Sequence, residues 1–306
     1  MSGSTPETGG YVAPNFPNPQ GPDDAHIIIY GYIPSFALCI LAIVLYTIAF
    51  FVHLYEVARY KTWYFLPLSL GCALEILGYI FRALSAHKDP YNIIDFVIQY
   101  FMIVTAPVFI SASIYVCLSR LITWATTEGL DLTRSRGAAR WIKPKGILWG
   151  FISCDVVSTV IQIAGAALIG KKESDHKDAT IPNNILLAGL AFQTFAFTVF
   201  LILLGLFRWT LQKQDKGTAS HSKDTFIAAL AGSSLLIYLR TSFRLAETSQ
   251  GVFGYLSTHE VFFGVLEFAP VIVAVWILAV WHPARSLPQR NLPTGHVEEH
   301  AEGQKW

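Results

Sequence analysis

The sequence carries little charge for its length. Of its 306 residues, 14% are charged and 53% are hydrophobic, whereas a typical soluble domain has about 25% charged residues. The 22 Lys and Arg nearly cancel the 21 Asp and Glu, which leaves a formal net charge of +1. Binding to nucleic acid through its phosphates requires a strongly basic face, so we expect no nucleic-acid partner. The composition indicates a membrane protein.

Lysine, histidine and cysteine are missing where particular chemistries would need them. No long apolar stretch contains a lysine, which excludes a retinal protein with a Schiff base. The histidines near these stretches lie at their ends, and the chain has no HExxH motif. The four cysteines fall inside apolar stretches, which favours packing residues over disulfides or metal ligands. We therefore expect no cofactor, no metal and no enzyme, and keep a zinc amidase only as a third hypothesis.

What the sequence has is long apolar runs. Residues 33–52 form a run of 20 without a charge, and residues 185–207 form a run of 23. Either is long enough to cross about 30 Å of hydrocarbon as a helix. The predicted structure is therefore all-α, a seven-helix transmembrane bundle over residues 32–282 between disordered tails at 1–31 and 283–306. The five further predicted spans are residues 63–85, 93–120, 147–169, 225–245 and 259–281.

The basic residues predict which way the bundle faces. The first, third and fifth connecting segments and the C-terminal tail hold two, six, four and three Lys and Arg, fifteen in all. The segments on the opposite side hold four. Under the positive-inside rule, this distribution places the N-terminus outside and the C-terminus in the cytoplasm. We expect an integral protein of the plasma membrane, and the vacuolar and endoplasmic-reticulum membranes fit the same orientation.

Polar side chains inside the predicted spans define the candidate site. An ionisable group near the bilayer centre costs at least about 2.5–3.5 kcal/mol, so it should face the bundle interior and have a partner. Residues seven apart share one helix face, and four spans carry such a polar pair. The polar candidates are Glu75, Arg82, Gln99, Asp155, Gln162, Gln193, Arg240, Arg244, Glu247, Glu260 and Glu267.

With the predicted orientation, most of these side chains lie between mid-membrane and the outer surface. We infer a polar cavity in the outer half of the bundle, closed near Asp155, where Pro107 and Pro270 bend two helices. Three arginines face four to six carboxylates there, so either a carboxyl is protonated or the cavity attracts cations. The alternative is that these groups are structural ion pairs and hydrogen bonds within the bundle. Gly78 and Gly165 are interpreted as small residues for close helix packing.

The same residues carry a family resemblance. Over about residues 30–285 the chain resembles the fungal RTA-like family, the lipid-translocating exporters named for resistance to aminocholesterol. Glu267 stands where members of that family are expected often to have Asp. The motifs that carry the resemblance are Glu75-x-x-Gly78-Tyr79-x-x-Arg82, Gln99 followed by Ala106-Pro107, Asp155 with Gln162-x-x-Gly165, Gly189-Leu190-x-x-Gln193, Arg240-x-x-Phe243-Arg244-x-x-Glu247 and His259-Glu260.

The resemblance implies a multi-pass protein linked to resistance to toxic amphiphiles and to sphingoid long-chain bases, with some relatives linked to porphyrin movement. Our leading hypothesis is a transporter or translocase of amphiphilic lipids or lipid-like compounds, with membrane lipids and an amphiphilic ligand as its partners. Its carboxylates and arginines, together with Tyr79, would bind the ligand. The alternative is a non-transporting membrane sensor or regulator of lipid asymmetry, in which the same groups form a ligand-responsive switch.

Overall fold

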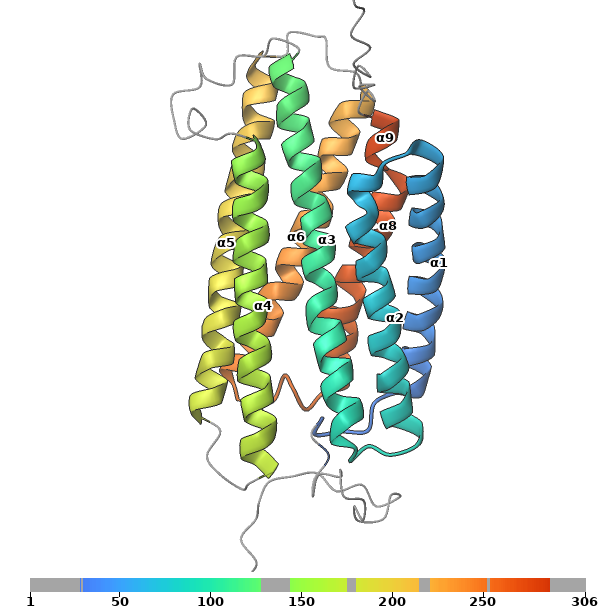
Figure 1. The fold of residues 1–306 in the computed structure, drawn as a ribbon, viewed down its shortest axis with the longest axis vertical. Helices are drawn as coiled ribbons and strands as arrows, with labels where there is room; N and C mark the ends of the chain where they lie inside the picture. Colours follow the sequence, from blue (N-terminus) through green and yellow to red (C-terminus); the bar gives the residue numbers. More distant parts are fainter. Residues whose placement is uncertain are drawn as a thin grey trace, which may run out of the picture.

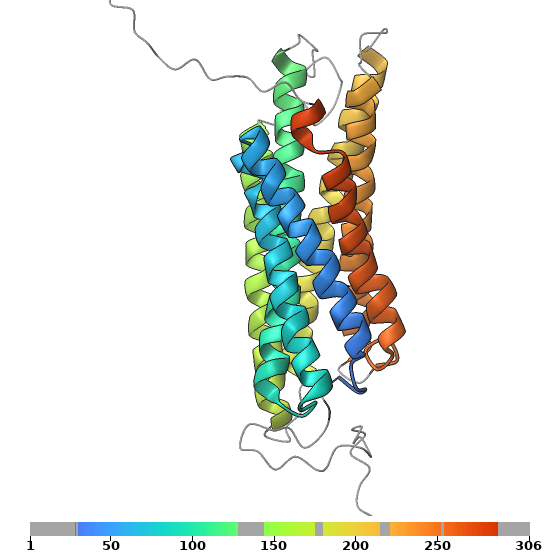
Figure 2. The same cartoon turned by 90° about the vertical axis from the view of Figure 1, so that its right-hand side faces the viewer.

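The computed structural model describes residues 28, 30–127, 144–174, 180–214, 221–251 and 254–286. Within these ranges, seven helices are long and apolar enough to cross a membrane, and they pack side by side as an elongated bundle (Figures 1 and 2). The prediction of an all-α bundle with seven such helices is confirmed, whereas its orientation in a membrane stays a prediction. We call the end at which α1 begins and α2 stops the lower end, as drawn in Figure 1.

The first six spanning helices alternate in direction along the chain. Several are longer than the apolar run that predicted them, because hydropathy marks only the part of a helix that suits hydrocarbon. α3 and α5 reach 35 residues each, and α3 continues through Pro107. The helices are α1 (Phe36–Tyr60), α2 (Leu66–His87, after the 3-10 turn Trp63–Phe65), α3 (Ile93–Thr127), α4 (Pro144–Ser174), α5 (Thr180–Gln214) and α6 (His221–Ser249).

The seventh span is composite. It consists of α7 (Glu260–Phe262), a π-helical segment η3 (Phe263–Phe268) and α8 (Ala269–Val280). Proline has no N–H, and its ring clashes with the carbonyl four residues earlier, so the widened segment directly before Pro270 relieves a conflict in the helix. The predicted distortion at Pro270 thus takes the form of a π-helical turn, and Glu267 lies inside it. A four-residue helix, α9 (Pro283–Ser286), follows at the upper end.

Glycines set the closest approaches between helices. A Cβ atom added to Gly165 of α4 would lie 2.7 Å from the backbone nitrogen of Leu186 in α5. At Gly78 of α2 it would lie 2.6 Å from Cγ1 of Ile103 in α3. The interpretation of these two glycines as packing residues is confirmed, and it fits helix association in lipid, which depends on close contact.

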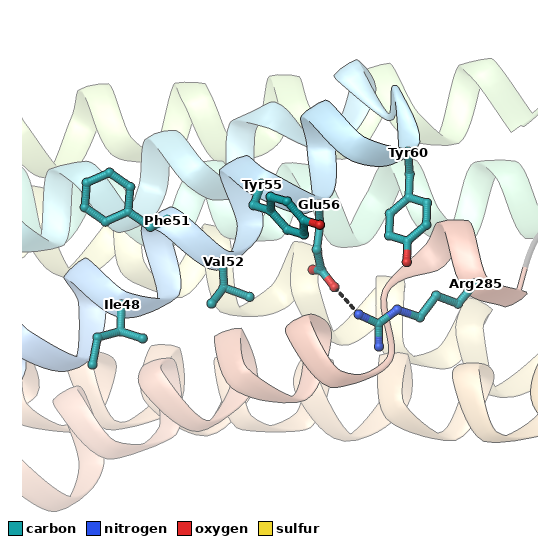
Figure 3. Close-up of a pocket in the computed structure, with 7 residues that line it drawn as sticks. All are labelled: Ile48, Phe51, Val52, Tyr55, Glu56, Tyr60 and Arg285. Carbon is teal, nitrogen blue, oxygen red and sulfur yellow. Dashed lines mark hydrogen bonds and ion pairs between the residues drawn. The ribbon is translucent and has the colours of Figure 1, made fainter.

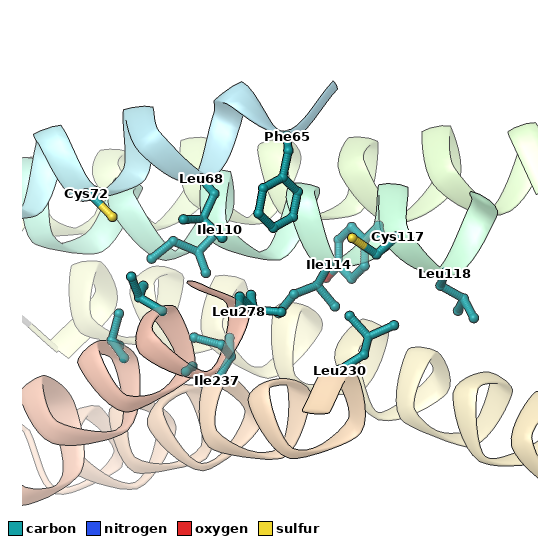
Figure 4. Close-up of a cluster of buried hydrophobic side chains, with 14 of the residues drawn as sticks. Phe65, Leu68, Cys72, Ile110, Ile114, Cys117, Leu118, Leu230, Ile237 and Leu278 are labelled. Atoms are coloured by element: carbon teal, nitrogen blue, oxygen red, sulfur yellow. The ribbon is translucent and has the colours of Figure 1, made fainter. Parts of the chain in front are cut away.

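The apolar core joins α2, α3, α6 and α8 along the middle of the bundle. Figure 4 shows Leu68 of α2 beside Ile110 of α3, with Leu278 of α8 and Ile237 of α6 across from them. Cys72 and Cys117 lie in the same cluster, and all four cysteines are free thiols. The prediction that the cysteines are packing residues is confirmed for Cys72 and Cys117.

Parts of both predicted tails belong to the bundle. Ile28 and Tyr30, assigned to a disordered tail, are buried against Tyr91 at the lower end. Arg285, also assigned to a tail, lies in α9 and binds Glu56 of α1. These residues were misassigned because their short segments add little to a hydropathy window. The rest of the predicted tails, residues 1–27, 29 and 287–306, lies outside the described residues.

Candidate functional site

The twelve predicted site residues all lie in the described part of the chain, and nine of them are buried. They do not form one continuous cluster of contacts. The structure distributes them over a central ion cluster, a lower cluster around Arg82, an ion pair at Arg244, and a set of uncharged contacts along α4 and α5. Each of these groups can do different chemistry.

The central ion cluster consists of Arg240, Glu267 and Glu75. Arg240 of α6 donates from Nε to Oε1 of Glu267 at 2.9 Å, and its Nη2 donates to the same oxygen. Nη2 also reaches the carbonyl of Ile103 in α3 at 3.3 Å. Glu75 of α2 is 2% exposed and interacts electrostatically with both Arg240 and Glu267. Two carboxyls therefore share the surroundings of one guanidinium in a buried site.

Aromatic rings enclose this cluster on the side of α1. Tyr79 is buried one turn from Glu75 along α2, and its ring stacks on Tyr46 of α1 at a centroid distance of 5.9 Å. Its edge contacts Phe263 and Phe268, which begin and end the π-helical segment. Tyr79 is therefore positioned as a wall beside the acids, and no described hydrogen bond assigns it a polar role.

The lower cluster is centred on Arg82 of α2. Its Nη2 donates to the hydroxyl of Tyr32 at 2.7 Å and lies 3.7 Å from Oε1 of Glu260. The guanidinium carbon also lies 3.9 Å from the centroid of the Phe263 ring, a close cation–π contact. Arg82 is thus held by one partly exposed acid and by aromatic groups, all near the lower end of the bundle.

A segment before α1 covers this cluster. The hydroxyl of Tyr30 donates to Oε1 of Gln99 at 2.6 Å and lies 3.2 Å from Oγ of Ser85. Burial raises the pKa of Tyr30 to about 12, although the nearby charge of Arg82 opposes the shift. The backbone N–H of Ser35 donates to Glu260 at 2.7 Å. Sequence reasoning missed Tyr30 and Tyr32, although the apolar and aromatic residues directly before the first span were a usable signal.

The Arg244 pair lies on α6, one turn beyond Arg240. Nη1 of Arg244 donates to Oε2 of Glu247 at 2.6 Å, and the guanidinium carbon lies 5.2 Å from the ring centroid of Tyr100 in α3. Both charged side chains are only partly buried. A pair of this kind, three residues apart on one helix, is a local structural contact by its geometry.

The predicted site residues on α4 and α5 are uncharged except for one carboxyl. Nε2 of Gln162 donates to Oε1 of Gln193 at 2.8 Å between the two helices. Asp155 of α4 accepts from the hydroxyl of Tyr115 in α3 at 2.8 Å, and its other oxygen is buried without a hydrogen-bond partner among the described residues. Asp155 shares none of the described partners of Glu75 or Glu267, so its membership of one common cavity stays a prediction.

Each of the three embedded arginines therefore holds a carboxylate of its own. The pairs join α2 to α7, α6 to η3, and α6 to itself, and none of the three includes Glu75. Within the described residues, no three His, Cys, Asp or Glu side chains are arranged to hold a metal ion. The three pairs are Arg82 with Glu260, Arg240 with Glu267, and Arg244 with Glu247.

A further polar group, which sequence reasoning did not select, lies at the upper end. Glu56 is 3% exposed and accepts from Nη2 of Arg285 at 2.6 Å, at one end of a groove of ≈ 580 Å³ beside α1 (Figure 3). His53 is buried one turn away and contacts the carbonyl of Val275. Glu56 was missed because it lies beyond the predicted first span at 33–52.

The helices and the buried ion pairs between them define an integral membrane protein with seven spanning helices. The model of a protein family described as RTA1 like protein matches residues 68–290, and the chain belongs to this family. The matched region contains all twelve predicted site residues. The resemblance noted from the motifs is thereby confirmed.

Three relatives from Saccharomyces cerevisiae show the range of similarity. Protein RTM1 is 32% identical over 212 residues, which cover 69% of this chain and 64% of that protein. Protoporphyrin uptake protein 1 is 28% identical over 289 residues, covering 82% of this chain and 91% of that protein. Sphingoid long-chain base transporter RSB1 is 27% identical over 304 residues, covering 87% and 75%. The chain thus spans less than two thirds of RTM1, and no solved structure matches it significantly.

Proposed function

We propose that this protein transports amphiphilic lipids or lipid-like compounds across a membrane, with a sphingoid long-chain base as the leading candidate. Two relatives support the substrate class, because one is named as a sphingoid long-chain base transporter and the other as a protoporphyrin uptake protein. A sphingoid base combines one positive charge with a long apolar tail. A bundle that carries it must therefore offer a buried acid to the ammonium group and an apolar wall to the tail.

The observation that carries the proposal is the position of Glu75. The three embedded arginines are paired with other carboxylates, while Glu75 is buried beside Arg240 and Glu267 and forms no ion pair with any residue that the structure describes. A buried carboxyl that lacks a full counter-charge is stabilised by a proton or by a cation. The ammonium group of a long-chain base would supply that cation, and Tyr79 and Phe268 would flank the first part of its tail.

We expect a ligand that enters from the lower end to meet the covering segment before it reaches Glu75. Tyr32 occupies a donor of Arg82, and Ser35 occupies an oxygen of Glu260. We infer that this closed arrangement opens when the segment leaves both partners. The π-helical segment offers the second moving part, because π-helical turns occur often at functional sites and Glu267 lies on it.

The non-transporting sensor is supported by one specific observation. The arginines of the lower half are paired and covered in this structure, as the groups of a switch at rest would be. In that case a lipid that displaced Tyr32 from Arg82 would change the position of the segment before α1 without crossing the bundle. Binding of the amphiphile would then be retained while flux would be absent.

Flux through reconstituted protein distinguishes the two functions. Liposomes with the wild-type chain are expected to move a fluorescent long-chain base faster than empty liposomes, and Glu75→Gln should reduce that rate at least about tenfold, or about 1.4 kcal/mol in the barrier. The matched control is Asp95→Asn, which removes a partly exposed acid at the lower end of α3. Unchanged flux in folded Glu75→Gln protein would refute the role of Glu75, and wild-type binding without flux would establish the sensor.

A further inference from the structure

We propose that the groove at the upper end binds an anionic phospholipid, with the phosphate on Arg285 and one acyl chain along α1. The site is separate from the polar groups of the lower half, so the inference does not depend on the transported compound. The groove is lined by residues of α1 and by Arg285 of α9 (Figure 3). The lining residues are Ile48, Phe51, Val52, Tyr55, Glu56, Tyr60 and Arg285.

Arg285 is fixed in place while half of its side chain stays exposed. Its Nη2 donates to Oε1 of Glu56 at 2.6 Å, and its Nη1 donates to the carbonyl of Val280 at 3.2 Å. The Arg285 side chain is 50% exposed, whereas Glu56 is 3% exposed. A guanidinium has five N–H groups in a fixed fork, and two of them make these bonds. The arrangement therefore orients Arg285 and leaves part of its fork to a phosphate, which favours bidentate arginine contacts.

The apolar wall of the groove continues from this charge toward the middle of the bundle. Ile48, Val52 and Glu56 are spaced four residues apart, so they follow one face of α1 over about 12 Å. Phe51 and Tyr55 flank this face and remain 60% and 68% exposed. Figure 3 shows Ile48 and Val52 directed toward α8, with Arg285 at the end of the row. An extended acyl chain laid along this row would cover apolar surface while its headgroup reached Arg285.

The charge that the groove presents to a ligand is positive. One oxygen of Glu56 is already bound to Arg285, and the other is buried away from solvent, 3.9 Å from Nδ1 of His53. A cationic headgroup would have no exposed carboxylate to bind there and would be repelled by Arg285. The predicted orientation also places this end at the cytoplasmic leaflet, where anionic lipids attract basic side chains. An anionic phospholipid is therefore favoured over a long-chain base at this site.

Lipid binding to the whole 306-residue chain tests the proposal. The purified chain in phosphatidylcholine nanodiscs is titrated with phosphatidic acid, and bound lipid is counted by native mass spectrometry. We expect phosphatidic acid to bind at least about tenfold more tightly than phosphatidylcholine, a difference of about 1.4 kcal/mol. Arg285→Gln should remove that preference, and Arg285→Lys should restore only part of it, because lysine keeps the charge but loses the fork.

Two further variants separate the groove from general surface charge. Val52→Trp fills the groove without changing any charge, so it should weaken phosphatidic acid binding at least about threefold, or about 0.7 kcal/mol. Arg59→Gln removes an exposed basic residue of the same helix that does not line the groove, and binding should stay within about twofold. If Arg285→Gln fails to fold with Glu56 unpaired, the double variant Glu56→Gln with Arg285→Gln replaces it.

Four results would overturn the proposal. Equal affinity for phosphatidylcholine would show that binding does not require a negatively charged headgroup. Competition by a long-chain base at equal affinity would show that the site binds cations. Competition by inorganic phosphate as strong as that by the lipid would show that the acyl chain contributes nothing. A loss in Arg59→Gln equal to that in Arg285→Gln would assign the binding to the general charge of this surface.

Discussion

Two sides of the bundle bury their polar groups by different means. On the side of α2, α6 and η3, arginines bind carboxylates, and on the side of α4 and α5 a pair of glutamines shares an amide hydrogen bond (Figure 1). The desolvation cost of a buried ion pair offsets much of its electrostatic attraction, whereas the desolvation cost of two hydrogen-bonded neutral amides is smaller. The charged side also holds the π-helical segment, while Gly165 brings α4 and α5 into close contact. We conclude that the charged side is the one suited to change its state.

The largest expected effect comes from breaking the charged side at its centre. Arg240→Ala leaves Glu267 and Glu75 buried without their cation, so we expect the free energy of unfolding to fall by about 3–5 kcal/mol. Thermal unfolding of the purified protein in detergent measures the loss. The double variant Arg240→Met with Glu267→Met removes both charges together and should recover most of the stability. If Arg240→Ala unfolds no earlier than Gln193→Ala, the two sides do not differ as described.

Glu75 and Asp155 are the two predicted site acids for which the described residues provide no arginine ion pair. Asp155 lies on α4 and accepts a hydrogen bond from Tyr115, and Asn at this position can still accept that hydrogen bond. Asp155→Asn should therefore reduce long-chain base flux by no more than about threefold, or about 0.7 kcal/mol, well below the effect of Glu75→Gln. Liposome flux measured on both variants in parallel decides the question. An equal loss in the two variants would mean that Glu75 and Asp155 contribute equally to transport of the cationic long-chain base.

The sequence predicted the helices better than the contacts between them. Hydropathy alone located seven spans, since apolar runs of about 20 residues have few alternatives. The spacing of Glu75 and Arg82 placed both on one face of α2, yet their partners lie on different segments, because one sequence contains no information on how neighbouring helices align. Of the three arginine pairs described above, that of Arg244 with Glu247 lies within a single helix, so its spacing in the sequence is enough to suggest it. The others required the assembled bundle.

Residues at the edges of the spans were the ones missed. Tyr32 and Glu56 lie just outside the windows that define the first span, and each acquires its role from a partner distant in sequence. Tyr32 binds Arg82, and Glu56 binds Arg285, across the packed helices. A hydropathy window places such residues outside the span, although each binds an arginine of another segment near one end of the bundle. The prediction therefore included the buried residues in the middle of the spans and omitted Tyr32 and Glu56 near their ends.

The coupling energy between Gln162 and Gln193 tests the uncharged side. Gln162→Leu leaves the amide of Gln193 buried without its partner, and we expect a loss of about 1 kcal/mol in the free energy of unfolding. A double-mutant cycle with Gln193→Leu should give a coupling energy near 0.6 kcal/mol, the average for hydrogen bonds between membrane helices. Unfolding in detergent of the wild type, both single variants and the double variant supplies the cycle. A coupling energy as large as that of Arg240 with Glu267 would remove the distinction between the sides.

The smallest effect concerns the segment that covers the charged side. The pKa of Tyr30 is raised to about 12, so the folded protein keeps this proton above the ordinary pKa near 10. The contribution of Tyr30 to stability is therefore complete below pH 10 and is lost as the pH rises from about 10 to 12. At pH 10 the loss relative to pH 8 is about 0.4 kcal/mol.

Thermal unfolding at the two pH values should show this difference between the wild type and Tyr30→Phe, which has no phenol to ionise. Gln162→Leu should follow the wild-type pH dependence, because its amide partner on the uncharged side does not titrate. If Tyr30→Phe also follows the wild type, the hydroxyl of Tyr30 does not hold the covering segment.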